Sequence, residues 1–124
     1  MDDLRLAVAE AIRRVKAEVR WKPGKDALHL QKRQAMGHLS ANASLTDYNI
    51  LIRSIIQDPH GQVFAYRLDM QPYVAVRSNV VGRPWLTIFS LTGIMETAFP
   101  PDDIEAYLAQ PGFTEIGIVQ ELLA

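Results

Sequence analysis

The sequence predicts an α+β domain, in which N-terminal helices pack on a small four-stranded antiparallel sheet and a short C-terminal helix follows. Two observations carry this prediction. Apolar residues recur with helical spacing up to about residue 57, and from residue 62 they alternate with a period of two. The alternating segments are short and joined by short turns, which favours an antiparallel meander. The chain of 124 residues suits a single domain with one modest core, residues 1–124.

Three helices are expected before the sheet. In the first, residues 3–20, apolar side chains recur every three or four positions and form one stripe. A Lys-Pro-Gly-Lys stretch breaks it, and a second helix is expected over 27–37, with Asp26 as its cap and Gly37 as its stop. The third helix is expected over 45–57, and it starts at Ser44 or Thr46.

Four strands, which form the expected sheet, should follow the helices. Their expected ranges are 62–68, 73–78, 84–91 and 94–99. Pro101 suits the first turn of a short helix, 101–109, with two acidic residues near its positive end. Residues 113–123 are expected to be a short strand or an apolar tail that packs back on the domain.

Composition excludes several classes of protein. The chain has no cysteine, so it has no disulfide framework and no thiolate nucleophile. No apolar run approaches the roughly 20 residues of a membrane span, and the acidic start is not that of a signal peptide. We therefore expect a cytoplasmic protein without a membrane partner. The three histidines lack metal-ligand spacing and no Gly-rich phosphate loop is present, so we expect neither a metal nor a cofactor.

The charge is spread unevenly along the chain. Residues 1–37 hold nine basic and five acidic residues, a net of +4, whereas the remainder holds four basic and nine acidic residues, a net of −5. Such asymmetry points to a polyanionic ligand for the N-terminal part. A solvated basic helix face explains it equally well.

The strongest cluster of candidate catalytic residues is His29, Lys32 and Arg33, which share one face of the second helix at i, i+3 and i+4. Histidine can take or give a proton near neutral pH, and a cation one turn away can hold a phosphate. This combination suits metal-free RNA cleavage, in which the 2′-hydroxyl attacks the neighbouring phosphate. The alternative is a solvated helix face.

Other candidates lie around the strands. Arg67 and Arg77 can line a sheet face that meets an anion, or they can form surface salt bridges. Thr97 and Phe99 precede the double proline, where Thr97 is either a hydroxyl of a site or an ordinary β-branched strand residue. His38, just past the glycine stop, is either a substrate-binding residue or a loop residue.

Several segments together carry a family resemblance. They are His-x-x-Lys-Arg on the second helix, Leu-Thr-Asp-Tyr-Asn-x-x-Ile on the third, the strand Tyr-Val-Ala-Val-Arg, and Gly-x-Met-Glu-Thr-Ala-Phe-Pro-Pro-Asp-Asp-Ile-Glu-x-Tyr-Leu. Over residues 27–117 the chain resembles phage- and toxin-associated domains of the superfamily that groups barnase, EndoU, colicin D and RelE-like nucleases. Residues 1–24 fall outside this resemblance as an accessory helix.

The resemblance implies a metal-independent, toxin-like endoribonuclease acting on tRNA or ribosome-associated RNA. His29 would then be the general base or acid, and Lys32 and Arg33 would hold the scissile phosphate. Arg77 would be the cation of a middle strand, Thr97 would donate to a phosphate oxygen, and Phe99 would shape the pocket or stack on a base. An immunity protein or antitoxin is the implied partner, and the basic first helix is either an RNA clamp or the interface of a homodimer. The alternative function is a non-catalytic binding domain on the same scaffold.

Overall fold

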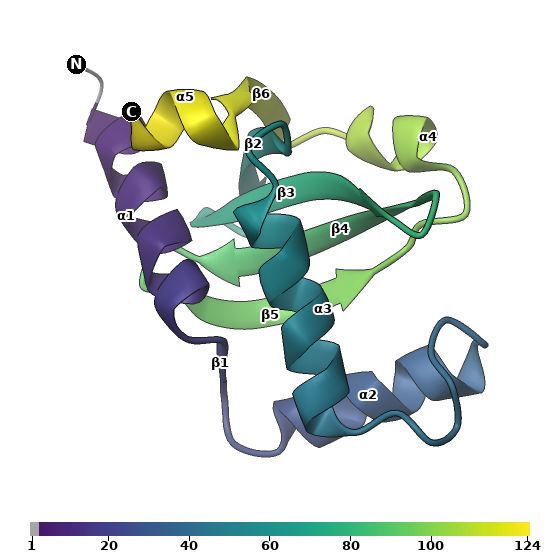
Figure 1. Ribbon diagram of the computed structural model, residues 1–124. Coiled ribbons are helices and arrows are strands. Elements are labelled where there is room, and N and C mark those ends of the chain that lie inside the picture. The colour runs from purple at the N-terminus through teal and green to yellow at the C-terminus, as the bar shows by residue number, and fades with distance from the viewer. Residues whose placement is uncertain (1–2) are drawn as a thin grey trace.

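The computed structural model describes residues 3–124, which form five helices and one six-stranded mixed sheet. Helices α1, α3 and α5 cover one face of the sheet, α2 lies below its lower edge, and α4 lies at the opposite end (Figure 1). The helices are α1 Asp3–Ala17, α2 Lys25–Ala35, α3 Leu45–Gln57, α4 Ile104–Leu108 and α5 Val119–Leu123. The strands are β1 Arg20–Trp21, β2 Gln62–Leu68, β3 Gln71–Val80, β4 Arg83–Ser90, β5 Ile94–Phe99 and β6 Phe113–Ile118.

The α+β class is confirmed, but the prediction of a four-stranded antiparallel sheet is wrong. The strand order is β1-β5-β4-β3-β2-β6. Strands β2 to β5 do form an antiparallel meander, and β6 adds to β2 as a fifth antiparallel strand. On the other edge, the two residues of β1 pair in parallel with β5. Both added strands pair with partners far away in sequence, so local periodicity carries little signal for them.

The main core lies between the sheet and the helices on its covered face. Helix α1 contributes Val8, Ile12 and Val15, all fully buried, and α3 contributes a row of isoleucines around Tyr48. The sequence set residues 1–24 apart as an accessory segment, yet the described part of α1 packs within this core. The helix is also shorter than expected, because the chain leaves it after Ala17 to pair β1 with β5.

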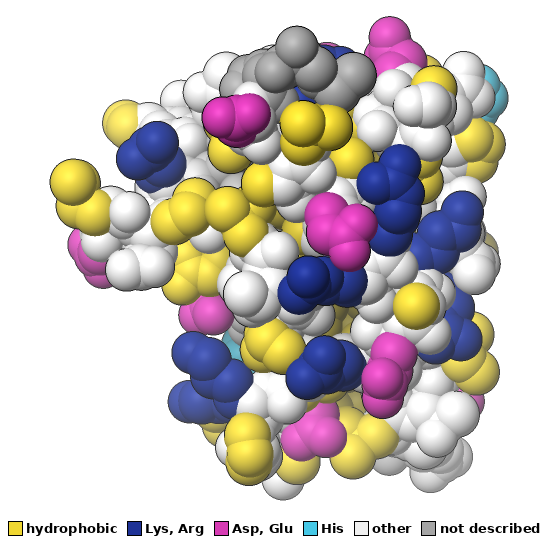
Figure 2. All heavy atoms as spheres, turned by 90° about the vertical axis from the view of Figure 1, so that its left-hand side faces the viewer, with side chains coloured by type: hydrophobic (Ala, Val, Ile, Leu, Met, Phe, Trp, Pro, Cys, Tyr) yellow, Lys and Arg dark blue, Asp and Glu magenta, His cyan; other side chains and the backbone are white. Residues whose placement is uncertain are grey.

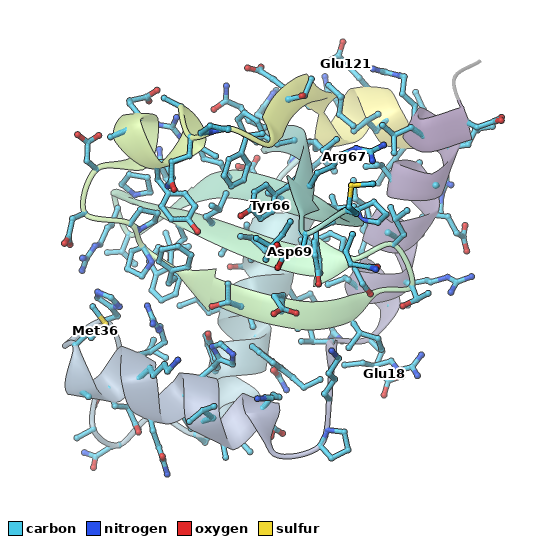
Figure 3. The ribbon with its side chains drawn as sticks, turned by 180° about the vertical axis from the view of Figure 1, so that it is seen from behind. Glu18, Met36, Tyr66, Arg67, Asp69 and Glu121 are labelled. Carbon is cyan, nitrogen blue, oxygen red and sulfur yellow. The ribbon has the colours of Figure 1, made fainter. Side chains whose placement is uncertain are left out.

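The opposite face of the sheet is largely free of helices and is turned toward the viewer in Figure 3, with Tyr66 lying on it. A second, smaller core forms here, where α4 contributes Ile104 against Leu86 and Ile88 of β4. Partly buried aromatic rings surround this core, and Tyr66 stacks on Phe113 at a centroid distance of 4.0 Å. We call this surface the open face.

The capping residues predicted from the sequence account for only some of the observed helix N-termini. Ser44 caps α3 in a reciprocal capping box with Asp47, as one of the two expected starts requires. Helix α2 instead begins after Gly24, which adopts a left-handed φ of 80°, so Asp26 lies in its first turn rather than at its cap. Helix α4 begins after Asp103, later than Pro101, because the Asp103 side chain accepts from the Ala106 N–H. None of the helices in residues 3–124 has the length and hydropathy that a membrane crossing requires.

Candidate functional site

A β-bulge in β5 determines which side chains face the site. Phe89 pairs with Met95 and Ile88 pairs with Thr97, so the register shifts by one residue at Glu96. Met95 and Ala98 both point into the main core, and the two residues between them do not. A bulge of this kind leaves two consecutive residues opposite one on the neighbouring strand. Glu96 and Thr97 are therefore both half-buried outside the main core, although a regular strand would place them on opposite faces.

Helix α2 runs beside β5 and ends in a turn that folds His38 back over it. Gly37 has a left-handed φ of 74°, its N–H donates to the Gln34 carbonyl, and the His38 N–H donates to the Arg33 carbonyl. These two bonds form a Schellman motif, which requires the glycine conformation at this position. The motif brings the His38 backbone over the last turn of α2, where its ring meets the Arg33 side chain.

Arg33 is buried without a carboxylate partner. Only 6% of the residue is exposed, and the ion pairs found among residues 3–124 do not include it. One guanidinium nitrogen donates to His38 Nδ1 at 3.0 Å, another lies 3.9 Å from the Met36 sulfur, and the group sits 5.5 Å above the centre of the Phe99 ring. Arg33 Nε is buried and has no hydrogen-bond partner within the described residues. Since a guanidinium only donates, His38 Nδ1 must accept, and the ring proton of neutral His38 is then on Nε2.

His29 lies one helical turn before Arg33 and reaches β5. Its Nδ1 is 3.4 Å from the Thr97 hydroxyl oxygen, a long contact compared with the usual range for such bonds. The His29 ring packs on Trp21 at a centroid distance of 5.3 Å and an angle of 30°. Trp21 is itself held, because its indole N–H donates to Asn49 on α3 at 3.0 Å. Strand β1 therefore serves as the wall that orients the imidazole.

Burial and neighbouring cations keep both imidazoles neutral. Desolvation lowers the pKa of His29 below its ordinary value, Lys32 and Arg33 lower it further, and the Glu96 carboxylate opposes them. The pKa of His38 is also lowered, first by desolvation and then by Arg33 and Arg83. A neutral imidazole can accept a proton, so His29 is suited to act as a base at neutral pH.

The structure brings together five of the eight residues that the sequence proposed, and we call them the α2–β5 site. They are His29, Arg33, His38, Thr97 and Phe99.

The other three lie elsewhere. Lys32 is exposed and acts on His29 only through its charge. Arg77 lies on the open face two strands from β5, where it pairs with Glu105 at 2.7 Å, which is the surface salt bridge that the sequence left as its alternative. Arg67 is exposed and belongs to the other face of β2, with Val63.

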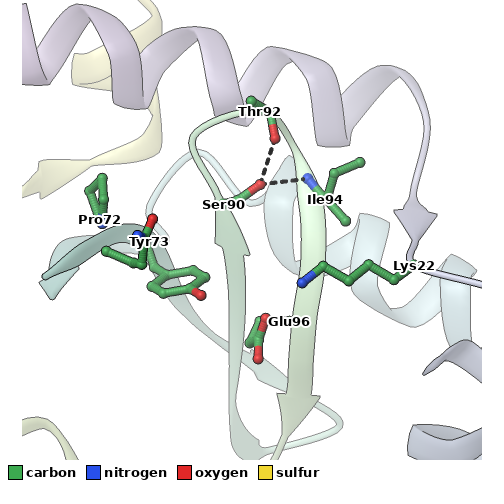
Figure 4. Close-up of a pocket in the computed structure, with 8 residues that line it drawn as sticks. Lys22, Pro72, Tyr73, Ser90, Thr92, Ile94 and Glu96 are labelled. Atoms are coloured by element: carbon green, nitrogen blue, oxygen red, sulfur yellow. Dashed lines mark hydrogen bonds between the residues drawn. The ribbon is translucent and has the colours of Figure 1, made fainter. Parts of the chain in front are cut away.

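Two residues near the site were missed from the sequence. Trp21 gave no signal, because a two-residue strand has no periodicity and its partner is more than 70 positions away. Glu96 is not among the candidates from the sequence, because a regular strand would point it away from Thr97. In Figure 4 the Glu96 side chain lies with Tyr73 and Lys22 around a hollow beside β5. The only available hint was the residue pattern of β5, in which the core residues Met95 and Ala98 stand three apart instead of two.

The basic face of the N-terminal part is mixed rather than uniformly cationic. Figure 2 shows Lys and Arg side chains interspersed with acidic and hydrophobic ones on the side of the molecule that α1 forms. Glu10 pairs with both Arg13 and Arg14, at 3.9 and 3.4 Å. For this stretch of α1 the solvated helix face is therefore the better interpretation.

The chain matches no protein-family model, no curated protein and no solved structure. Its fold and site define it by themselves as an α+β protein with a cationic, imidazole-lined site at the edge of a mixed sheet. Within residues 3–124, no three His, Asp or Glu side chains converge as metal ligands.

Proposed function

We propose that this protein is a metal-independent endoribonuclease that cleaves RNA by attack of the 2′-hydroxyl on the adjacent phosphate. The observation that carries the proposal is Arg33, a buried guanidinium without a carboxylate that lies between two imidazoles. A buried charge is expensive unless an opposite charge compensates it, so the site favours an anionic ligand. Planar guanidinium groups bind phosphate oxygens in a bidentate manner, which makes a phosphodiester the natural ligand.

Each group of the α2–β5 site has a role in this reaction. Arg33 holds the non-bridging phosphate oxygens and stabilises the charge that develops on them. The Thr97 hydroxyl and the Nε2–H of His38 donate to the same oxygens. Neutral His29 takes the proton of the 2′-hydroxyl as its oxygen attacks phosphorus and the bond from phosphorus to the 5′-oxygen breaks. The 5′-oxygen takes a proton from solvent water and leaves as a hydroxyl group. The products are a 2′,3′-cyclic phosphate and a 5′-hydroxyl end.

The family resemblance supports a narrower form of the proposal. Its members are often toxins that act on tRNA or on ribosome-associated RNA. We propose the same class of substrate here, together with an immunity protein or antitoxin that neutralises the activity. Three of the residues that the resemblance implies support this proposal by their proximity: His29 Nδ1 lies 3.4 Å from the Thr97 hydroxyl oxygen, and the charge of Arg33 acts on His29.

A non-catalytic RNA-binding domain is the second candidate. Two observations favour it: the long 3.4 Å contact between His29 and Thr97, and the aromatic rings that remain partly exposed on the open face. Aromatic side chains bind single-stranded RNA by stacking on its bases, and this needs no general base.

Cleavage of total RNA and of pooled tRNA, in EDTA, separates the two candidates. Wild type should give discrete fragments with cyclic-phosphate ends, and His29→Ala should lose at least about 100-fold in rate, the usual contribution of a general base. His60→Ala is the matched control. His60 lies exposed in a turn after α3, so this variant should cleave RNA at the wild-type rate. The rate should also fall at acidic pH with a midpoint below the ordinary histidine pKa of about 6.5, because the pKa of His29 is lowered.

The result decides between the candidates in a direct way. RNA that is bound by both proteins and cleaved by neither supports the binding domain. Cleavage that persists in His29→Ala at the wild-type rate would show that His29 is not the base.

A further inference from the structure

A small cavity adjoins the α2–β5 site on the open face. Its volume is about 230 Å³, and β3, β4 and β5 meet around it with Lys22, which follows β1 (Figure 4). The cavity is lined by Lys22, Gln71, Pro72, Tyr73, Ser90, Thr92, Ile94 and Glu96. The mechanism proposed above uses none of these residues.

The two aliphatic hydroxyls of the cavity are already engaged, but its carboxylate is not. Ser90 Oγ accepts from the Ile94 N–H at 3.1 Å and is hydrogen-bonded to the Thr92 hydroxyl at 2.8 Å, where either group can donate. In contrast, no hydrogen bond or ion pair within residues 3–124 engages the half-buried carboxylate of Glu96. An ionised carboxylate accepts hydrogen bonds and donates none. The cavity therefore offers a strong, unused acceptor to a ligand that carries N–H groups.

The cavity lies within reach of a nucleotide whose phosphate occupies the site. Glu96 directly precedes Thr97 in the bulge, and its charge acts on His29. Ser90, on the cavity side, lies two residues along β4 from Ile88, the partner of Thr97. Two residues of a strand span roughly 7 Å, which is comparable to the size of one nucleotide unit.

We propose that this cavity is a nucleobase subsite that selects bases carrying an exocyclic amino group and rejects uracil. The inference rests on the ribonuclease function proposed above, because it places the adjoining phosphate at Arg33. Adenine, cytosine and guanine each present an amino group that donates to a carboxylate. Uracil has no exocyclic amino group, and carbonyl oxygens flank its single ring N3–H on both sides, so the Glu96 carboxylate meets oxygens that repel it.

Two other residues of the cavity fit a base. The Tyr73 ring lines the wall and provides a surface on which a base can stack. Lys22 has no acid within ion-pair distance in the part of the chain that the structure describes, and it can donate to a base carbonyl or to the following phosphate. A site built around a hydrogen bond from an amino group discriminates against a base without one, since the half-buried carboxylate then loses its best donor.

Binding of the four nucleoside 3′-monophosphates, which cannot be cleaved, tests the subsite independently of catalysis. Wild type should bind the adenosine, cytidine and guanosine nucleotides at least about tenfold more tightly than the uridine nucleotide. Glu96→Gln should remove this difference, because an amide can donate to the uracil carbonyl as well as accept. Glu115→Gln, an exposed acid on β6, is the matched control and should keep the wild-type order. Tyr73→Leu should weaken the binding of all four nucleotides by a similar factor and leave their order of affinity unchanged.

The outcomes separate this inference from the proposed function. Equal affinity for all four nucleotides, or an unchanged preference in Glu96→Gln, would overturn the subsite. Cleavage by wild type at uridine as often as elsewhere would overturn the subsite and leave the ribonuclease intact. Loss of all cleavage in Glu96→Gln with unchanged nucleotide preference would make Glu96 a catalytic residue instead. Selective binding of the amino-bearing nucleotides without any cleavage would support the subsite and refute the nuclease.

Discussion

At the scale of single residues, the surroundings of Arg33 lower the stability of the free protein and suit the binding of an anion. The residue is 6% exposed, its guanidinium meets an imidazole, a thioether and an aromatic ring, and its Nε finds no hydrogen-bond partner among residues 3–124. Desolvation accordingly lowers the pKa of this side chain. Such an arrangement is destabilising in the free protein, and a bound anion would relieve it. Residues of this kind are typical of functional sites rather than of cores selected for stability.

Arg33→Met should therefore stabilise the free protein while it abolishes anion binding. The flexible methionine fills a similar space, and the loss of the unpaired charge should raise the free energy of unfolding by about 1 kcal/mol. Thermal unfolding with and without inorganic phosphate measures both effects. Phosphate at 100 times its dissociation constant should stabilise wild type by about 2.7 kcal/mol and leave the variant unchanged.

Arg53→Met provides the control for this experiment, because Arg53 lies on α3 and donates to the Ala17 carbonyl at 3.3 Å, away from the site. This control should keep the phosphate response. A large destabilisation of Arg33→Met would mean that Arg33 serves the fold and not a ligand.

Helical spacing placed His29 and Arg33 together but also predicted Lys32 beside them, which is exposed, and sequence reasoning failed where a bulge intervenes. The i, i+4 spacing of His29 and Arg33 places both beside β5, and Gly37 was recognised as the stop that turns the chain toward His38. Glu96 could not be placed, because a bulge depends on pairing with β4 and not on the residues of β5 alone.

At the scale of elements, one buried hydrogen bond joins α3 to the strand that carries the site. Tyr48 is fully buried, and its hydroxyl donates to the Ala98 carbonyl at 2.6 Å. Ala98 follows Thr97 and precedes Phe99, so this bond fixes the part of β5 that faces α2. Burial raises the pKa of Tyr48 to about 12.

Tyr48→Phe should lower the free energy of unfolding by about 1–2 kcal/mol, because the buried Ala98 carbonyl loses its partner. Chemical denaturation measures this loss, and Tyr66→Phe, on the open face, should change stability by less than about 0.5 kcal/mol. The folded-state pKa of Tyr48 is raised above its ordinary value of about 10. The neutral phenol therefore stabilises the fold fully below pH 10 and loses this contribution as the pH rises toward 12, a slope that Tyr48→Phe should reduce. An unchanged denaturation midpoint would show that the bond contributes nothing.

The strands that the sequence missed are those that lack a local pattern. The meander β2 to β5 follows from alternation and short turns, both of which are local properties. Strand β1 is two residues long, and β6 is paired with β2 only after α4 has crossed the open face. Tertiary packing determines which strands β1 and β6 pair with, so this pairing cannot be predicted from local sequence patterns.

At the scale of the whole molecule, the two ends of the chain close the fold together. Helix α5 packs on α1, and Leu122 is 7% exposed within the main core beside residues of α1. The Arg5 side chain donates to the Ile116 carbonyl of β6, which ties the first helix to the last strand. The C-terminal stretch, for which the sequence left a choice between a strand and a tail, is thus a strand followed by a helix that completes the core.

Leu122→Ala tests whether this closure stabilises the entire domain. Truncating a buried leucine removes apolar contacts and leaves a cavity, so the free energy of unfolding should fall by about 2–3 kcal/mol. Leu6→Ala, on α1 with 51% of the residue exposed, is the matched control and should cost less than about 1 kcal/mol. Because α1, α5 and β6 share one core, circular dichroism and the fluorescence of the two tryptophans, Trp21 and Trp85, should report the same transition midpoint in the variant. Two separate transitions, or a loss no larger than that of Leu6→Ala, would mean that the C-terminal elements fold apart from the sheet that carries the α2–β5 site.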